Sequence, residues 1–324
     1  MAKVVREELI RQLADGKFIS GQHLAEQLSV SRTAISKHIK VLNEMGLDIF
    51  SVQGKGYKLA QSITLLDLHK ITSELATFNR KNFVEVHSII DSTNSYLMRR
   101  LPNNVAHGQA CVSEFQSAGR GRRGKEWISP FGSHLYLSMY WYLEQGMSAA
   151  MGISLVVGLA VSDVLQQRYA LDVQLKWPND IYVNGKKLAG ILVELEGQSI
   201  GPGNCVIGLG LNINMPKQSA EKIDQPWTDL ATELGDEIDR NVLSAQLIAR
   251  ISERLEQHHQ FGLTPMLDDW QRQDFFYNKQ VKLLTGEKET RGVCKGINSS
   301  GALLLEIDGK QQPIYGGEVS LRGA

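Results

Sequence analysis

The segment that most constrains the fold is a glycine- and arginine-rich loop between two β-like runs. It reads GRGRRG over residues 119–124 and so satisfies the G-x-G-x-x-G pattern of dinucleotide-binding folds. Those folds require a helix directly after the loop. Residues 128–142 are instead rich in aromatic and β-branched side chains and contain Pro130 and Gly132, which is typical of a strand. A Rossmann fold with an NAD site is therefore disfavoured.

The same loop concentrates positive charge. Together with Lys125 it carries four fixed cations in seven residues, although the formal net charge of the chain is zero. Glycines let the backbone approach a ligand closely, and guanidinium groups pair with carboxylate or phosphate oxygens through two parallel hydrogen bonds. We expect the loop to bind a polyanion, or a carboxylate and a phosphate held side by side. A solvated basic turn is the alternative.

The composition excludes several other classes of protein. A chain of 324 residues with 42% hydrophobic and 22% charged residues suits two or three globular domains. No apolar run is long enough to cross a bilayer, and the N-terminus lacks the apolar core of a secretory signal. The three cysteines lie far apart and outside any CxxC pair, which indicates neither disulfides nor a zinc site. We expect a cytoplasmic protein that does not bind membranes.

The first 60 residues have the pattern of a winged helix-turn-helix. An apolar stripe predicts a helix that ends near Gly16, a second helix covers residues 21–28, and Ser31 is placed to cap a third helix that runs to Met45. Two β-like runs then enclose a basic tip at residues 54–56, which we interpret as a wing. Nine Lys and Arg against six Asp and Glu in this segment permit contact with nucleic acid.

The third helix presents a short, polar and basic face opposite its apolar face, as a recognition helix does. A three-helix module for packing or dimerisation is the alternative. The residues expected to contact DNA are Ser31, Arg32, Thr33, Ser36, Lys37, Lys40 and Lys55.

Polar residues at several predicted strand ends indicate where the chemistry lies. Asp91 or Ser92 is placed to cap a helix that runs to Leu101, and so Ser92, Thr93 and Asn94 lie at its N-terminus. These residues either seat a polar head group or only cap the helix. The Asn184-Gly185 turn predicts a hairpin that brings Lys176 and Lys187 to the two sides of one antiparallel unit. Together with the arginine-rich loop, these residues predict a site at the rim of a sheet.

The missing motifs narrow the reaction. There is no G-x-S-x-G elbow, no H-E-x-x-H and no G-x-x-x-x-G-K-[ST] loop. A cluster of Arg and Lys with one carboxylate suits a reaction that needs charge neutralised and reactants aligned, such as adenylation of a carboxylic acid. After residue 270, short strands separated by tight turns predict a small β barrel.

Taken in order, the motifs resemble the biotin–protein ligase family, and within it the bifunctional bacterial members that also repress the biotin operon. The resemblance covers nearly the whole chain. It implies an α+β fold with a winged helix-turn-helix at 1–63, a mixed-sheet catalytic domain of class II synthetase-like type at 64–270, and an SH3-like barrel at 271–324. The motifs that carry it are GRGRRG before Trp127, KWPND at 176–180, KLAGILVE from Lys187, GLGLNIN from Gly208 and a terminal GGEVSLR.

The resemblance implies a two-step reaction: biotin and ATP give biotinyl-5′-AMP and pyrophosphate, and a carrier-domain lysine then takes the biotinyl group. It implies that Lys187, Arg122, Asp180 and Lys176 are catalytic, with Asp180 facing Mg²⁺. The residues implied to hold biotin are Ser92, Thr93, Asn94, Gln116, Arg120, Gly121, Arg122 and Lys187. Those implied to contact the nucleotide are Arg120, Arg122, Trp127, Lys176, Asn179, Asn212, Trp227 and Arg322.

The implied partners are the biotin carboxyl carrier protein of acetyl-CoA carboxylase, biotin-operator DNA, and a second copy of the chain when biotinyl-AMP is bound. Two features depart from the family pattern: Lys125 stands where arginine is expected, and the segment after Met215 is more polar than the usual adenine cap. A non-catalytic biotin sensor, a lipoate–protein ligase, and a ligase whose helix-turn-helix serves only for packing remain alternatives.

Overall fold

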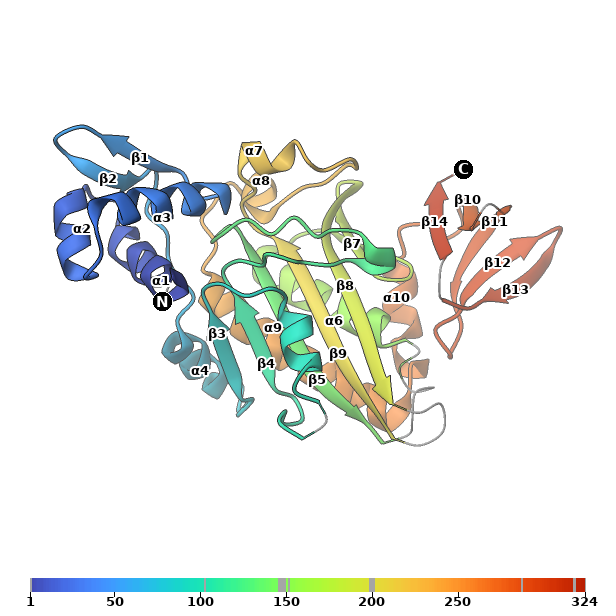
Figure 1. The fold of residues 1–324 in the computed structure, drawn as a ribbon. Coiled ribbons are helices and arrows are strands. Elements are labelled where there is room, and N and C mark those ends of the chain that lie inside the picture. The colour runs from blue at the N-terminus through green and yellow to red at the C-terminus, as the bar shows by residue number, and fades with distance from the viewer. Residues whose placement is uncertain are drawn as a thin grey trace.

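The computed structural model describes residues 2–101, 103–144, 150, 152–197, 202–286, 288–316 and 319–323. Figure 1 shows three parts in a row. Helices and a small hairpin form the N-terminal part, a large sheet with helices forms the centre, and a small sheet forms the C-terminal part. No helix in the described ranges is long and apolar enough to cross a membrane.

The N-terminal part has the predicted winged helix-turn-helix arrangement. Ser20 and Ser31 cap the second and third helices by accepting hydrogen bonds from His23 N–H and Ala34 N–H. The apolar stripe of each helix faces a shared core, and β1 pairs with β2 in an antiparallel hairpin. The elements are α1 (Ala2–Leu13), α2 (Gly21–Gln27), α3 (Arg32–Glu44), β1 (Ile49–Val52) and β2 (Gly56–Leu59).

A seven-stranded mixed sheet of order β3-β4-β5-β9-β8-β7-β6 forms the centre. Only β3 and β4 pair in parallel; the other neighbours are antiparallel. The predicted Asn184-Gly185 turn joins β7 to β8, with both residues at positive φ (50° and 72°) as a tight hairpin requires. The strands are β3 (Val84–His87), β4 (Ala110–Ser113), β5 (His134–Leu143), β6 (Val173–Lys176), β7 (Asp180–Val183), β8 (Lys186–Gly197) and β9 (Gly203–Asn212).

Helices cover both faces of this sheet. Figure 1 shows α5 in front of it and α6 and α9 behind it. α6 is buried on nearly every side because it lies between the sheet and α9. The helices are α4 (Leu68–Thr77), α5 (Thr93–Met98), α6 (Ile153–Tyr169), α7 (Lys217–Ala220), α8 (Leu230–Leu234), α9 (Arg240–Phe261) and α10 (Leu267–Gln273), with 3₁₀ turns η1 (Arg122–Gly124) and η3 (Thr264–Met266).

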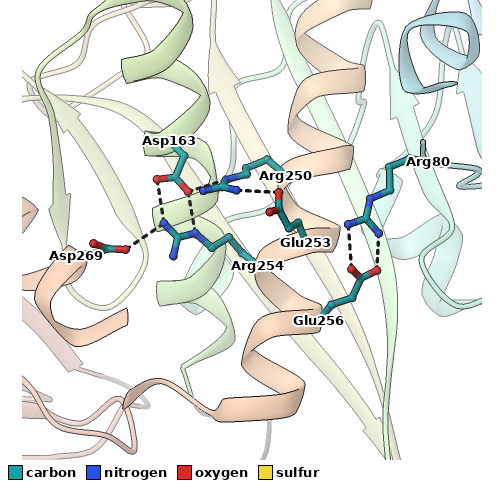
Figure 2. A network of polar contacts seen from close by, with 7 residues as sticks. All are labelled: Arg80, Asp163, Arg250, Glu253, Arg254, Glu256 and Asp269. Carbon is teal, nitrogen blue, oxygen red and sulfur yellow. Dashed lines mark hydrogen bonds and ion pairs between the residues drawn. The ribbon is translucent and has the colours of Figure 1, made fainter. Parts of the chain in front are cut away.

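An ion-pair network joins the covering helices (Figure 2). Asp163 on α6 accepts hydrogen bonds from Arg250 and Arg254 on α9, each at 2.8 Å. Arg254 also donates to Asp269 on α10 at 3.2 Å. Arg254 is largely buried, and a buried charge needs a partner. Carboxylates on two other helices, α6 and α10, provide it. The network therefore fixes α10, the last helix before the C-terminal sheet, against the core.

The C-terminal part is a five-stranded antiparallel sheet of order β13-β12-β11-β10-β14. The sequence predicts the first four strands but not the fifth, Val319–Gly323, which pairs with β10. Residues 317 and 318 of the GGEVSLR motif lie outside the described residues. The other strands are β10 (Gln280–Thr285), β11 (Lys288–Ile297), β12 (Leu303–Ile307) and β13 (Lys310–Ile314).

Among the contacts that join the N-terminal part to the centre in the described residues, those of Phe131 and Arg240 are the most direct. Phe131, 3% exposed, is packed into the N-terminal core, and its N–H donates to Met45 O, at the end of α3, at 2.9 Å. Further on, the buried pair of Arg240 and Glu114 (2.6 Å) holds the connecting segment, because Arg240 also donates to Thr64 O at 2.7 Å. The backbone of the segment that connects the two parts is therefore hydrogen-bonded to a buried ion pair of the central part.

Candidate active site

A cavity of about 540 Å³ opens at the rim of the central sheet. It is bounded by α5, the arginine-rich loop, the β6–β7 turn, the start of β8 and β14 from the C-terminal sheet. Most of the site residues predicted from the sequence therefore meet in one place. Those that line it are Ser92, Thr93, Asn94, Gln116, Arg120, Gly121, Arg122, Trp127, Lys176, Asn179, Asp180, Lys187 and Arg322.

The α5 end of the cavity is a buried polar seat. Ser92 caps α5, accepting from Ser95 N–H, so its hydroxyl has the structural role that the sequence left open. Thr93 donates through its N–H and its hydroxyl to Gln116 Oε1, at 2.9 and 3.1 Å. Asn94 donates to Glu194 Oε2 at 2.8 Å. These groups hold one another in place and present donors and acceptors to a small polar ring.

Glycines make the floor of the cavity. A Cβ built on Gly208 would lie 2.4 Å from Asn94 Oδ1, and one on Gly210 would lie 2.4 Å from the Trp127 indole. These two residues of β9 therefore allow the seat and the indole to lie directly on the strand. The indole N–H of Trp127 is buried and has no hydrogen-bond partner among the described residues. It is a donor available to a ligand.

The arginine-rich loop closes one side of the cavity. Arg120 pairs with Glu194 at 3.1 Å, the same carboxylate that Asn94 binds. Arg122 donates from Nη1 to Asn179 Oδ1 at 3.0 Å, and burial lowers the pKa of its guanidinium, which nevertheless stays charged. As predicted, no α-helix follows the loop. A 3₁₀ turn (Arg122–Gly124) lies within the loop itself, and the strand expected over residues 128–142 begins only at His134, as β5.

Two lysines and one carboxylate lie at the opposite side. Lys187 Nζ is 2.8 Å from Asp180 Oδ1 and 5.6 Å from the centre of the Trp127 ring. Lys176 pairs in register with Asp180 across β6 and β7 and donates to the hydroxyl of Tyr182 at 3.1 Å. Burial is the main cause that lowers the pKa of Lys176, with Lys187 and Arg322 adding to it and Asp180 opposing it. The site therefore gathers positive charge around one acidic group.

Asn212 and Trp227 are the two predicted nucleotide contacts that do not line this cavity. Asn212 is buried and donates to Thr228 O at 3.0 Å. Trp227 pairs through its backbone with Lys187. Asn212 thus holds the segment at 226–228 to the end of β9, and Trp227 holds it to the start of β8. The neighbouring residues Asp224, Gln225 and Pro226 line the cavity instead.

Sequence reasoning missed two further residues of the site. Glu194 joins the seat to the arginine-rich loop, and Tyr182 contacts Lys176. Glu194 is the last residue of KLAGILVE, and Tyr182 lies two residues after KWPND. The available signal for Glu194 was an acidic residue directly after the apolar run from Leu188 to Val193.

The metal question rests on Asp180. No group of three or more His, Cys, Asp or Glu side chains in the described ranges could hold a metal ion. A dedicated protein cage for a cation is therefore missing from this part of the chain. Mg²⁺ usually binds through one or two carboxylates together with substrate phosphates. Asp180, half-buried in the cavity, fits such a shared role.

The predicted DNA-contacting residues are placed for contact with a large ligand. The seven residues from Ser31 to Lys40 and at Lys55 that the sequence assigns to DNA are all exposed. Lys55 lies at the tip of the β1–β2 hairpin, 5.8 Å from the ring of Phe18. The polar face of α3 and the basic tip therefore lie on the surface of the N-terminal part.

Three family descriptions match consecutive parts of the chain. Residues 5–58 match the HTH domain, residues 86–212 the biotin/lipoate A/B protein ligase family, and residues 276–322 the biotin protein ligase C terminal domain. The first and third matches follow the sequence prediction at either end of the molecule. The second covers the strands and loops that build most of the cavity.

Relatives match over nearly the full length. The chain is 50% identical over 316 residues to the bifunctional ligase/repressor BirA of Salmonella typhimurium, covering 98% of this chain and 97% of that protein. It is 48% identical over 317 residues to BirA of Escherichia coli, covering 98% and 97%. A structure of biotin protein ligase from Aquifex aeolicus in complex with biotin and ATP superposes with a TM-score of 0.64 at 29% identity, covering 76% of this chain and 100% of that one. This chain belongs to the biotin/lipoate A/B protein ligase family, and it is similar over nearly its full length to bifunctional ligase/repressor members of that family.

Proposed function

We propose that the chain is a biotin–protein ligase that also represses transcription. It makes biotinyl-5′-AMP from biotin and ATP, transfers the biotinyl group to a lysine of the biotin carboxyl carrier protein, and binds biotin-operator DNA as a dimer. The observation that carries the proposal is one cavity in which a buried polar seat, an arginine-rich loop and two lysines meet. The full-length relatives support both activities.

The first step needs a carboxylate and a triphosphate brought together. A biotin carboxylate oxygen attacks the α-phosphorus of ATP, and the bond to the β-phosphate breaks so that pyrophosphate leaves. Thr93, Asn94 and Gln116 would hold the ring of biotin. Arg122 and Lys187 would neutralise the negative charge that gathers where carboxylate meets phosphate, which favours the transition state over the separated anions.

The remaining assignments follow the lining of the cavity. Arg120 and Gly121 would lie over biotin, while Trp127, Asn179 and Arg322 would face the nucleotide. Asp180 would hold Mg²⁺ that arrives on the phosphates, where the ion would offset phosphate charge. Asn212 and Trp227 would act from behind the cavity wall, by keeping the 226–228 segment in place.

In the second step the neutral amine of the carrier lysine attacks the biotinyl carbonyl. The bond to the phosphate oxygen breaks, AMP leaves, and the amine loses a proton as the amide forms. The closed arginine-rich loop would keep water from the mixed anhydride until the amine arrives. We further propose domains at 1–63, 64–270 and 271–324, and action in the cytoplasm, where the three free, buried cysteines would stay reduced.

The repressor role places the exposed face of α3 in the major groove. Two copies paired through a two-fold axis would present two recognition helices to two half-sites of the operator. Formation of the adenylate would favour that pairing by linkage. A gel shift on operator DNA with and without biotinyl-AMP tests this half of the function.

Pyrophosphate exchange and carrier labelling test the ligase half. We expect biotin-dependent exchange of labelled pyrophosphate into ATP, and biotin transfer to an apo carrier domain. Lys187→Met keeps most of the side-chain volume but removes the charge, so exchange should fall about 100- to 1,000-fold. Lys186→Met, on an exposed neighbour, is the control and should keep wild-type rates. Equal rates in the two variants would contradict the role of Lys187.

A further inference from the structure

Lys176 differs from Lys187 and Arg120, two other cations of the cavity, in the groups that hold it. Lys187 pairs with Asp180 at 2.8 Å and Arg120 with Glu194 at 3.1 Å. In the part of the chain that the structure describes, no carboxylate forms an ion pair with the Lys176 ammonium. Its charge is therefore not cancelled by a directly paired anion.

Aromatic rings take the place of a counter-ion. The hydroxyl of Tyr182 accepts a hydrogen bond from Lys176 at 3.1 Å. The ammonium lies 5.1 Å from the centre of the Tyr182 ring and 5.9 Å from that of Phe276. Ring faces attract a cation through their quadrupole without neutralising it. Burial raises the pKa of Tyr182 to about 12, so its hydroxyl also stays neutral at physiological pH.

The two rings come from different parts of the chain and are fixed independently of the lysine. Tyr182 lies on β7, and Phe276 lies just before β10 of the C-terminal sheet. Phe275 stacks on Tyr182 with centroids 5.1 Å apart and planes inclined by 23°. The N–H of Phe275 donates to Leu175 O at 2.9 Å, next to the lysine itself. The start of the C-terminal part is thus docked directly behind Lys176.

Packing alone would explain buried rings at a junction between two parts of a chain. Packing does not explain why the hydroxyl of Tyr182 accepts a hydrogen bond from Lys176. Nor does it explain why Tyr182 and Lys176 line the cavity while Phe275 and Phe276 do not. A buried lysine held by neutral groups has a charge available to an anionic ligand. The anion that the proposed function brings to this side of the cavity is the triphosphate of ATP.

We propose that Tyr182 and Phe276 are positioning residues, an aromatic bracket that holds the Lys176 ammonium toward the β- and γ-phosphates, which leave as pyrophosphate. The inference rests on the proposed function and deepens it. The bracket acts in the first half-reaction, because pyrophosphate is absent from the second. It also makes the start of the C-terminal part a determinant of ATP use.

The test separates the two half-reactions. Tyr182→Phe removes the hydroxyl and Phe276→Leu removes the ring face; each should raise the KM for ATP in pyrophosphate exchange about 3- to 30-fold. Transfer of biotin from supplied biotinyl-AMP to the carrier domain should stay within about twofold of wild type, because that step involves no pyrophosphate. Phe276→Tyr, which keeps the ring, should restore exchange.

Tyr140→Phe is the matched control, because it deletes a phenol that bonds to Asn204 outside the cavity. An unchanged KM for ATP in Tyr182→Phe and Phe276→Leu would overturn the bracket. An equal loss in both half-reactions would also overturn it, since general damage to the fold predicts that result. Calorimetric binding of tripolyphosphate gives a readout that needs no biotin. Absence of exchange in the wild-type chain would instead contradict the proposed function, and the calorimetric comparison would still test the bracket.

Discussion

At the scale of single residues, Arg122 has the clearest expected effect. Its guanidinium reaches across the cavity to Asn179 at 3.0 Å and so holds the arginine-rich loop against the β6–β7 turn. Arg122→Ala should loosen that closure, shorten the lifetime of bound biotinyl-AMP and let it escape to react with bystander lysines. Labelling of an added protein that is not a carrier measures the escape.

Arg168→Ala, on an exposed arginine at the end of α6, controls for loss of an arginine elsewhere. A variant at position 122 that labels only the carrier domain, with wild-type retention of the adenylate, would contradict the proposed role. The same reasoning applies to Asn179, whose amide also donates to Ile191 O at 2.8 Å.

His134 gives a prediction about stability and pH. The residue is fully buried, its Nδ1 accepts from Ile213 N–H at 2.9 Å, and burial lowers its pKa from 6.5 to about 3. The unfolded chain therefore binds one more proton than the folded chain between those values, so stability is full above about pH 6.5 and falls as pH drops. This residue alone should cost about 1.4 kcal/mol between pH 7.5 and 5.5.

Urea unfolding at the two pH values measures the contribution of His134 to the change in the free energy of unfolding. His134→Asn keeps an oxygen that can accept from Ile213 N–H but does not titrate, so the pH dependence should be smaller than in wild type by the predicted amount. Other histidines with lowered pKa, such as His258, remain in both proteins and cancel in the comparison. An unchanged pH dependence would show that His134 is protonated equally in both states.

At the scale of elements, β9 shows how alternate glycines make room for a ligand seat. Gly208 faces Asn94 so closely that an added Cβ would lie 2.4 Å from Oδ1. Gly208→Ala should push Asn94 out of its bond to Glu194 and raise the KM for biotin at least about tenfold, because the buried amide loses its partner. Steady-state assays at saturating ATP measure this.

Gly316→Ala is the control, because a Cβ there would meet nothing within 4 Å. If Gly208→Ala left the KM for biotin unchanged, the seat would have to lie away from Asn94. The outcome depends on the close approach of α5, which carries Asn94, to Gly208 on β9.

Elements with local signals were predictable from the sequence, and those set by long-range packing were not. The cap at Ser31 and the turn at Asn184-Gly185 depend on neighbouring residues only, and both are confirmed. The helix expected to run to Leu101 instead ends at Met98, because its register is set by packing on β5 and β9. The strand Val319–Gly323 was missed because its partner, β10, is remote in sequence.

Within the site, too, residues with a local sequence signal were predictable and residues placed by long-range contacts were not. Residues inside specific motifs, such as Lys187 and Asp180, meet in the cavity as expected. Glu194 and Phe276 were not predicted, since nothing local shows that one would bind the arginine-rich loop or that the other would cross from the C-terminal part. Asn212 closes a strand as predicted, yet its amide faces Thr228 O, away from the cavity.

At the scale of the whole molecule, the question is how the DNA-binding part is held on the ligase part. The side chain of Phe131, a residue of the central part, packs into the N-terminal core. Its N–H donates to Met45 O at the end of α3. The segment just before it carries Ser129, whose hydroxyl accepts a hydrogen bond at 3.3 Å from Gln116 of the polar seat. One short stretch therefore contacts both the end of the recognition helix and the seat.

Phe131→Ala should remove the apolar anchor and let the N-terminal part reorient. The proposed dimer would need its two recognition helices at a fixed spacing, so DNA affinity in a gel shift should fall at least about tenfold. Pyrophosphate exchange should change by less than about threefold, because the N–H and the backbone at residue 131 remain. Phe261→Ala, on an aromatic that is 64% exposed, is the control. Loss of exchange to the same extent as DNA binding would mean that Phe131 supports the seat and the DNA-binding part together, and would reject it as a separate anchor.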